Sequence, residues 1–238
     1  MAKRKQKRTE QRRSVSLITI ADPKSPISEK YRTLRTNIRF AMAGRNLQSL
    51  VVTSSGPSEG KSTTSANLAV VFAQTGQNVL LVDADLRKPV IAKTFDLPNE
   101  TGLSVYLSDL NVTVDEIVQP SYLLDNMDIV TSGPIAPNPS ELLQSNRMNQ
   151  FLTDMAQFYD MIILDMPPVL AVTDAQIVST KVDGTLLVVR EDQSSKQAVK
   201  KSVELLRQVD ANLLGVVYNG SKREEDKGYY YYYGDKKK

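Results

Sequence analysis

Short runs of apolar residues alternate with helical patterns along most of the chain. Such runs predict buried strands, and the segments between them show the apolar spacing that is typical of helices. Strands are predicted at 49–53, 79–82, 127–130, 161–164, 185–189 and 213–218, and helices at 62–74, at 195–208 and from residue 138 onward. Continuously apolar strands separated by helices indicate a mostly parallel sheet that is covered on both faces. The predicted fold class is therefore α/β.

A further helix is predicted to begin at Ser25, a capping residue that stands before a proline, and to end near Gly44. Apolar residues share one face of this helix. The opposite face carries Glu29 and Arg32, with Arg35 at its edge. On spacing alone, we interpret this charged face as solvent exposed, with local ion pairs worth a few tenths of a kcal/mol.

The two ends of the chain differ in composition from its middle. Residues 1–24 are predicted to be a flexible basic arm, since residues 1–13 hold seven Lys or Arg side chains and one Glu. Residues 25–220 are predicted to form the folded domain, with the helix at 25–43 as its first element, and 221–238 a flexible tail rich in tyrosine. The net charge of the whole chain is only +3, so the body is slightly acidic and no specific nucleic-acid partner is expected. The arm is either a solubility tail or a segment that binds anionic lipid headgroups.

The composition excludes several kinds of chemistry. The chain has no cysteine, which excludes disulfides, thiolate zinc sites and a cysteine nucleophile. It has no histidine either, which excludes a Ser-His-Asp triad and the usual catalytic zinc sites. No apolar run approaches the ~18 residues of a membrane-spanning helix. The apolar segment 15–21, which follows the basic residues of the arm, is too short for a signal peptide. We therefore expect a protein of the cytoplasm, or one attached to the inner face of the cell membrane.

A phosphate-binding loop is predicted between the first strand and the helix that follows it. Gly60, Lys61 and Ser62 end this connection, which is the context of a Walker A motif. In such a loop the backbone amides face the phosphates, the lysine reaches the β- and γ-phosphates, and the serine hydroxyl ligates Mg²⁺. The predicted nucleotide-binding residues are Gly56, Pro57, Ser58, Glu59, Gly60, Lys61, Ser62 and Thr63.

Acidic residues follow two further predicted strands. Asp83 and Asp85 come directly after one strand, and Asp165 after another. The carboxyl ends of parallel strands meet at the edge of a sheet where ligands bind, so these carboxylates are expected beside Lys61. Each could instead cap the next helix, but together with Lys61 they favour a Mg²⁺ site. Asp83 is predicted to be the base for an incoming phenol, because tyrosine has a pKa near 10 and no histidine is present.

These motifs resemble those of the bacterial BY-type tyrosine kinases of capsule and exopolysaccharide synthesis, in their short cytoplasmic form. The similar segments are 29–35 (the Glu-x-x-Arg-x-x-Arg assembly helix), 57–62 (Walker A), 80–87 (Walker A′), 138–143 (Asn-Pro-Ser-Glu-Leu-Leu), 162–168 (Walker B) and 229–233 (the terminal tyrosine cluster). The resemblance covers roughly residues 25–233. It implies a P-loop NTPase fold of the MinD/ParA type and a protein tyrosine kinase that uses ATP and Mg²⁺.

The resemblance implies a role for each of these residues. Asp83, Lys61 and Asp85 would be catalytic, and Ser62, Asp85 and Asp165 would hold the metal or its waters. The residues that would bridge subunits of a ring-shaped homo-oligomer are Glu29, Arg32 and Arg35. Those that a neighbouring subunit would phosphorylate are Tyr229, Tyr230, Tyr231, Tyr232 and Tyr233.

Partners also follow from the resemblance. The short form depends on a separate transmembrane activator of the polysaccharide co-polymerase type, which would hold it at the inner face of the membrane. A cognate tyrosine phosphatase is expected to reverse the modification. The choice of ATP over GTP rests on the resemblance, and the Asn-Lys-x-Asp pattern that reads guanine is absent from the sequence.

Two other functions stay open from the sequence. One is a MinD/ParA-like switch ATPase that phosphorylates no protein, and the other is a scaffold that uses nucleotide only for assembly. The switch group carries an additional lysine five positions before the phosphate lysine, where this chain has Gly56. The tyrosine cluster also counts against a switch, although a cluster considered alone would be interpreted as a sticky low-complexity end.

Overall fold

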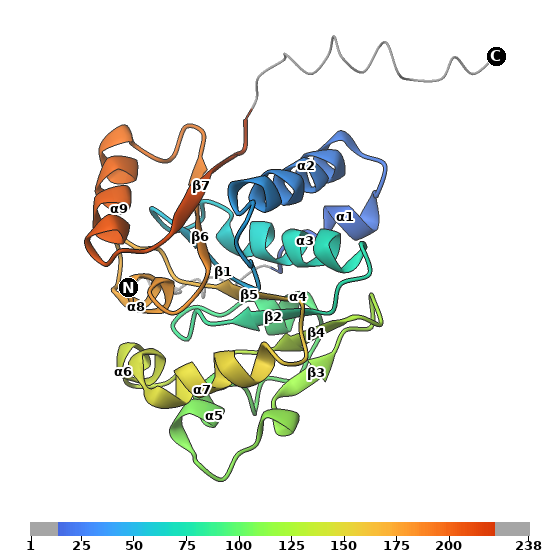
Figure 1. Ribbon diagram of the computed structural model, residues 1–238, viewed down its shortest axis with the longest axis vertical. Helices are drawn as coiled ribbons and strands as arrows, with labels where there is room; N and C mark the ends of the chain where they lie inside the picture. The colour runs from blue at the N-terminus through green and yellow to red at the C-terminus, as the bar shows by residue number, and fades with distance from the viewer. Residues whose placement is uncertain (1–13, 222–238) are drawn as a thin grey trace, which may run out of the picture.

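A seven-stranded sheet forms the centre of the structure (Figure 1). The computed structural model describes residues 14–221, so the first part of the basic arm and the tyrosine-rich tail lie outside the described residues. The strands are β1 (Ser49–Ser54), β2 (Val79–Asp83), β3 (Val118–Pro120), β4 (Met127–Val130), β5 (Met161–Asp165), β6 (Gly184–Arg190) and β7 (Leu213–Asn219). Their order is β3-β4-β2-β5-β1-β6-β7, and all neighbours are parallel except β3 with β4. The prediction of a mostly parallel α/β sheet is confirmed.

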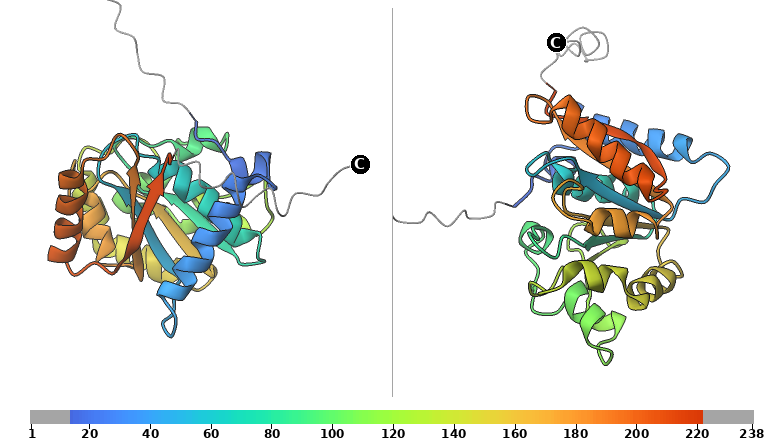
Figure 2. Two further views of the ribbon diagram at one scale, coloured as in Figure 1. Left: turned by 90° about the horizontal axis from the view of Figure 1, so that it is seen from above. Right: turned by 90° about the vertical axis from the view of Figure 1, so that its left-hand side faces the viewer.

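Helices cover both faces of this sheet. They are α1 (Ile18–Ala21), α2 (Pro26–Ala41), α3 (Lys61–Ala73), α4 (Ile91–Thr94), α5 (Leu103–Ser108), α6 (Pro139–Gln144), α7 (Asn146–Met155), α8 (Asp174–Ser179) and α9 (Lys196–Gln208), with a 3-10 turn at Val114–Glu116. Side chains alternate along a strand, so Leu50 and Val52 of β1 pack with α3, whereas Val51 packs on the other face with Phe151 of α7. Figures 1 and 2 show β7 lying between α2 and α9.

The second helix has the predicted features. The side chain of Ser25 accepts a hydrogen bond from the backbone N–H of Ser28, which caps α2 at its first turn. Ile38 is buried against the sheet, and Tyr31 and Leu34 on the same face are partly buried there. The middle and C-terminal part of the apolar face of α2 is therefore covered by the core, whereas Ile27 in its first turn is exposed.

The expected boundary of the basic arm at residue 24 is wrong, because residues 14–24 belong to the folded body. Thr19 in α1 is buried, and both its N–H and its hydroxyl donate to the side-chain oxygen of Asn67 in α3. The amide group of Asn67 donates in turn to the carbonyl of Ser16. The polar groups of this segment are therefore paired with a buried asparagine on a helix far away in the sequence. The local sequence of residues 14–24 does not indicate this pairing.

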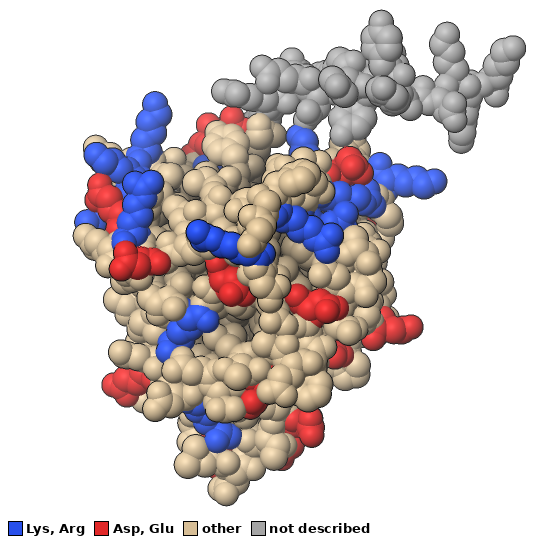
Figure 3. Space-filling view, viewed as in Figure 1, with Lys and Arg blue, Asp and Glu red and all other residues tan. Residues whose placement is uncertain are grey.

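The surface shows no single dominant charge on the face in Figure 3. Lys and Arg side chains over α9 and α2 are interspersed with Asp and Glu, and the lower part of this face carries scattered charges of both signs among uncharged residues. Within residues 14–221, none of the helices has the length and apolar character needed to cross a membrane.

Candidate active site

The P-loop, residues 55–60, joins β1 to α3 at the carboxyl edge of the sheet. It ends at Gly60, which has a left-handed conformation with φ of 98°. A Cβ at this position would lie 2.0 Å from Nδ2 of Asn219 at the end of β7. Glycine is therefore required here both by the backbone and by the close approach of β7.

Glu59 holds the P-loop from inside. Its carboxylate is buried and accepts hydrogen bonds from the hydroxyl of Ser55, the N–H of Gly56 (2.9 Å) and the hydroxyl of Ser194. Glu59 was predicted as a nucleotide-binding residue, and the structure turns its carboxylate toward the loop and the segment after β6. Ser194 carries no sequence motif, and it reaches the loop because β6 pairs with β1.

Three further side chains from the ends of β6 and β7 bond to P-loop carbonyls. Arg190 donates to the carbonyl of Ser58, Gln193 to that of Pro57, and Asn219 to that of Glu59 at 3.0 Å. The P-loop is thus supported by residues that are more than a hundred positions away in the chain. These bonds hold the carbonyl groups of three consecutive loop residues, 57–59, in place.

Lys61 lies at the centre of a buried charge cluster. Its Nζ is 2.9 Å from Oδ2 of Asp85 and 3.3 Å from Oδ2 of Asp165. Burial alone would lower the pKa of Lys61, but attraction to Asp165 and Asp85 outweighs burial and raises that pKa above its usual range. The predicted lysine and two of the predicted carboxylates therefore come together, and the lysine is charged at neutral pH.

Asp165, at the end of β5, also meets the start of α3. Its Oδ2 accepts a hydrogen bond from the hydroxyl of Ser62 at 2.5 Å, and its Oδ1 accepts one from Ser65 at 3.0 Å. Burial raises the pKa of Asp165, and Lys61 counteracts that effect. Ser65 was not predicted; its spacing of three residues from Ser62 places both hydroxyls on one face of the helix.

Asp83 is the register partner of Asp165 in the neighbouring strand. Its Oδ2 accepts hydrogen bonds from the N–H groups of Val90 and Ile91 at 3.0 and 2.9 Å. Its Oδ1 is buried and has no hydrogen-bond partner within the described residues. Burial, and then the charge of Asp165, raise the pKa of Asp83 to about 7. Within residues 14–221, Oδ1 of Asp83 is therefore a buried hydrogen-bond acceptor that no donor reaches.

Asp85 differs from Asp83 in its surroundings. It contacts Lys61 directly, and its Oδ1 accepts hydrogen bonds from the N–H groups of Arg87 and Lys88. Burial would raise the pKa of Asp85, but Lys61 and these N–H groups lower it overall. Asp85 is thus held ionised, while Asp83 has an oxygen that no donor among residues 14–221 reaches; this arrangement suits two carboxylates with separate roles.

Arg87 has a partner that the sequence did not indicate. Its guanidinium bonds to both carboxylate oxygens of Asp174, at the start of α8, and to the hydroxyl of Ser140 in α6. In the structure its side chain pairs with Asp174, and its backbone N–H bonds to Asp85.

The residues present fit Mg²⁺ only together with a phosphate. Within residues 14–221, no group of three or more Asp, Glu, His or Cys is arranged to hold a metal ion by itself. Protein sites for Mg²⁺ commonly use one or two carboxylates together with substrate phosphates and water. The hydroxyl of Ser62 and the carboxylates of Asp85 and Asp165 are oxygen ligands of the type that Mg²⁺ prefers. The donor set is therefore that of a metal–nucleotide site.

Two predicted sets of residues lie elsewhere. Glu29 and Arg32 form an ion pair on α2 at 2.8 Å, and Arg32 also donates to the carbonyl of Pro23. Arg35 donates to the carbonyl of Val71 at the C-terminal part of α3. The predicted phosphorylation sites, residues 229–233, lie outside the described residues.

The site contains a strand, a glycine-containing loop and a helix that begins with Lys-Ser, and carboxylates from the ends of two other strands lie beside it. This combination defines a P-loop NTPase. The family model that matches the chain, over residues 46–233, is ParA, described as NUBPL iron-transfer P-loop NTPase. Among curated proteins, the tyrosine-protein kinase YwqD of Bacillus subtilis is 46% identical over 229 residues, covering 96% of this chain and 95% of that protein. The chain therefore belongs to the bacterial BY-type tyrosine kinases, a family of ParA-like P-loop NTPases, and it is an enzyme of that class.

Solved structures agree with this assignment. The chimerical protein CapA2B2 is 44% identical, with a TM-score of 0.83, over 88% of this chain and 93% of that one. The kinase domain of the Escherichia coli tyrosine kinase ETK is 37% identical, with a TM-score of 0.84, over 91% and 86%. The resemblance found in the sequence is thereby confirmed.

Proposed function

We propose that this kinase transfers the γ-phosphoryl group of ATP to tyrosines 229–233 of a neighbouring copy of the chain. Through this autophosphorylation it would regulate the synthesis and export of a capsular polysaccharide or exopolysaccharide. The single observation that carries the proposal is the pairing of Lys61 with two carboxylates beside Asp83, whose buried Oδ1 has no hydrogen-bond partner among the described residues. A phosphate-binding lysine and a proton acceptor thus lie in one cluster.

Residues 56–63 would hold the triphosphate. The backbone amides of the loop and of the first turn of α3 supply donors for an anion, and Lys61 adds a full positive charge. Glu59 and Asn219 support this role indirectly, because they hold the loop in shape. Catalysis of this kind requires placement and charge stabilisation more than covalent chemistry by the protein.

Mg²⁺ would be held by Ser62, with Asp85 and Asp165 bonding to it or to its waters. When bound, it neutralises charge that develops on the phosphate oxygens. Asp85 is suited to this position because its carboxylate stays ionised beside Lys61. Ser65 donates to Asp165 and fixes the orientation of that carboxylate.

In the transfer step, the phenolic oxygen of the tyrosine attacks the γ-phosphorus. A bond forms between that oxygen and phosphorus, and the bond between phosphorus and the oxygen that bridges the β- and γ-phosphates breaks, leaving ADP. The phenolic proton moves to Oδ1 of Asp83. The N–H groups of Val90 and Ile91 bind Oδ2 of Asp83, so Oδ1 is the oxygen that would take this proton.

The length of the tail permits transfer between copies. Twelve residues separate Asn219, at the end of β7, from Tyr231, and an extended chain of that length spans at most ~40 Å. Phosphorylation of all five tyrosines would add about −7 to −10 charges to the tail. We expect that this charge favours dissociation of a homo-oligomeric ring.

The proposed partners are a transmembrane activator of the polysaccharide co-polymerase type and a cognate tyrosine phosphatase. The activator would hold the kinase at the inner face of the cell membrane. The name of one relative supports a role in polysaccharide synthesis. It is a putative tyrosine-protein kinase in the cps region of Klebsiella pneumoniae, and it is 38% identical over 220 residues. That region accounts for 30% of the Klebsiella protein, so a related domain also occurs within a longer chain.

The test is incubation of the full chain with ATP and Mg²⁺, followed by intact mass and a phosphosite map. We expect phosphate gains on residues 229–233 that are absent from Lys61→Met and from Asp83→Asn. Asp83→Asn should still bind nucleotide, which separates loss of chemistry from loss of folding. Lys201→Met, on the surface of α9, is the matched control for removal of a lysine.

A mixing experiment tests transfer between copies. Isotopically labelled Lys61→Met chain should gain phosphate only when unlabelled active chain is present. Release of ADP by the wild-type chain without any gain of phosphate would instead show a switch ATPase and overturn the proposal.

A further inference from the structure

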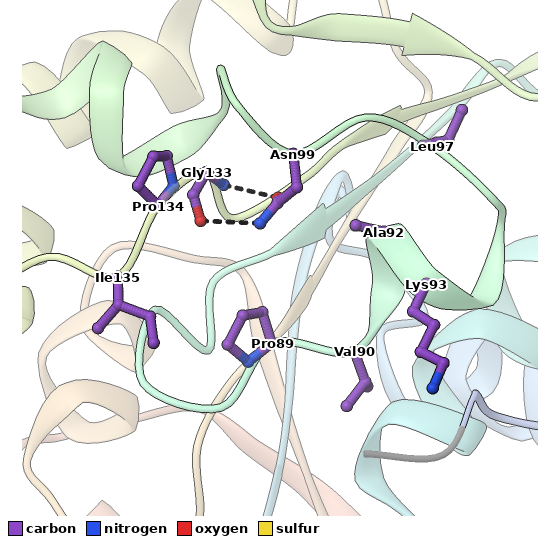
Figure 4. Close-up of a pocket in the computed structure, with 9 residues that line it drawn as sticks. All are labelled: Pro89, Val90, Ala92, Lys93, Leu97, Asn99, Gly133, Pro134 and Ile135. Atoms are coloured by element: carbon purple, nitrogen blue, oxygen red, sulfur yellow. Dashed lines mark hydrogen bonds between the residues drawn. The ribbon is translucent and has the colours of Figure 1, made fainter. Parts of the chain in front are cut away.

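A groove of about 460 Å³ lies beside the candidate active site, between the segment that begins α4 and the loop after β4 (Figure 4). Its lining is mostly apolar and includes Pro89, Val90, Leu97, Pro134 and Ile135. This size lies within the range of pockets that bind small organic groups. The groove has no role in binding nucleotide as described above.

The two walls of the groove are tied together. The side chain of Asn99 donates to the carbonyl of Gly133 at 3.0 Å and accepts a hydrogen bond from the N–H of Gly133 at 2.9 Å (Figure 4). Ser132 donates to the same asparagine oxygen. The groove is therefore a preformed feature, and a ligand would not have to pay for ordering these walls.

The groove and Asp83 share one contact residue, Val90. Val90 lines the groove and also donates its backbone N–H to Oδ2 of Asp83 at 3.0 Å. A tyrosine that presented its hydroxyl to Oδ1 of Asp83 would therefore place the residues beside it close to the groove. Ile135, at the groove, is 66% exposed, which leaves apolar area for such residues to cover.

We propose that this groove binds the tyrosine side chains that flank the target tyrosine in the tail of a second copy, residues 222–238. The inference rests on the proposed function and adds a substrate-binding site to it. In a run of five tyrosines, any central target has a second aromatic ring on either side. Such rings bury much apolar area and can keep their hydroxyl groups in water, which suits an open groove with proline and aliphatic walls.

The charges of the groove and of the tail are complementary, which supports the tail as the ligand of the groove. Lys93 of α4 lines the groove, and the tail carries Glu224, Glu225 and Asp226 just before its tyrosines. An acidic segment bound along the groove would place negative charge near this lysine. The attraction would be sensitive to salt, since Lys93 lies at an open site.

Topology favours the tail of a second copy over the chain's own tail. The described chain ends beyond β7, which β5, β1 and β6 separate from β2. Four strand spacings are roughly 19 Å, which the chain's own tail is long enough to span, but a tail crossing these strands would run over the P-loop, where the nucleotide is proposed to bind. A tail from a neighbouring copy can approach the groove from outside.

The test measures phosphate transfer from the full chain to a synthetic peptide of residues 222–238. We expect Ile135→Ser to raise the KM for the peptide by about tenfold with kcat nearly unchanged, because it removes apolar contact in the complex. The affinity for nucleotide should not change. The matched control is Leu110→Ser, since Leu110 is also an exposed aliphatic residue (81%) but is not part of the groove.

Lys93→Ala gives a second, independent measurement. It should raise the KM for this peptide, and the difference from the wild type should vanish at high salt or when Glu224, Glu225 and Asp226 of the peptide are replaced by glutamine and asparagine. An unchanged KM in both Ile135→Ser and Lys93→Ala would overturn the inference while leaving the proposed function standing. A wild-type chain that transfers no phosphate to any tail tyrosine would overturn the proposed function itself.

Discussion

Arg87 and Asp174 form a two-point ion pair that joins the segment after β2 to the start of α8. Nε of Arg87 lies 2.8 Å from Oδ2 of Asp174, and Nη2 lies 3.0 Å from Oδ1. Ser140 of α6 donates to the same carboxylate at 2.6 Å. The carboxylate is fully buried, so the pair fixes the segment that also carries Asp85.

The first prediction is that Asp174→Asn destabilises the protein by about 2 kcal/mol, because it weakens hydrogen bonds to a charged group. Phosphate transfer should fall as well, since the segment that places Asp85 beside Lys61 becomes less fixed. Urea unfolding and a transfer assay would measure the two effects. Asp125→Asn, at an exposed turn, is the control. Wild-type stability of Asp174→Asn would show that this ion pair contributes nothing to the fold.

A second prediction concerns the buried carboxylate of Glu59. Glu59→Gln replaces one of its two acceptor oxygens with a donor group, so the bonds from Ser55, Gly56 and Ser194 cannot all persist. We expect nucleotide affinity to fall by about tenfold, which corresponds to the loss of one hydrogen bond to a charged group. Titration with a fluorescent ATP analogue measures this. Glu204→Gln on α9 should bind like the wild type, and equal affinity in both variants would contradict the prediction.

The third prediction is a dependence of stability on pH at Tyr159. Burial, and then its hydrogen bond to Asp128, raise the pKa of Tyr159 above its usual range. An unfolded tyrosine ionises near pH 10. Because the folded-state pKa is the higher one, the contribution of Tyr159 is fully present below about pH 10 and is lost as the pH rises further.

Tyr159→Phe should therefore be less stable than the wild type by about 1 kcal/mol at neutral pH. The difference should become smaller above about pH 10, where only the wild type has this phenol to ionise on unfolding. Urea unfolding across this pH range measures the difference, and Tyr122→Phe, which removes an exposed hydroxyl, is the control. A difference that grows with pH would contradict the assigned direction of the shift.

The central part of the candidate site could be predicted from the sequence. Asp83 and Asp165 end short apolar strands, and Lys61 begins the helix after the loop that follows a third strand. Parallel strands bring their carboxyl ends to one edge of a sheet. In the structure β1, β5 and β2 are adjacent, so the residues that follow these strands lie side by side. Local sequence and one rule about sheets were therefore sufficient to bring these three residues together.

The supporting residues could not be predicted in the same way. Asp174 and Ser194 lie in segments without a motif, and they reach the site only through the packing of α8 and the pairing of β6 with β1. The segment at 14–24 shows a similar limit. Its short apolar run does not predict a helix or strand. The segment packs against the core and bonds to Asn67, a residue of α3 whose sequence context does not indicate this role.

The last prediction tests the proposed ring through α2. Within one chain, Arg32 pairs with Glu29 and Arg35 donates to the carbonyl of Val71, so both arginines already have local partners. If they also bridge copies, Arg32→Ala with Arg35→Ala should abolish the oligomer while costing the monomer only about 1 kcal/mol. Sedimentation gives the mass and urea unfolding gives the stability.

Arg39→Ala is the matched control, because Arg39 lies on the same helix and its local partner is the side chain of Gln77. This variant should lose a similar local contact and keep the oligomer. An oligomer that survives the double change would show that the charged face of α2 is only solvent exposed, as its spacing alone indicates. An oligomer lost equally in Arg39→Ala would assign the effect to general charge on α2 and would contradict a specific role for Arg32 and Arg35.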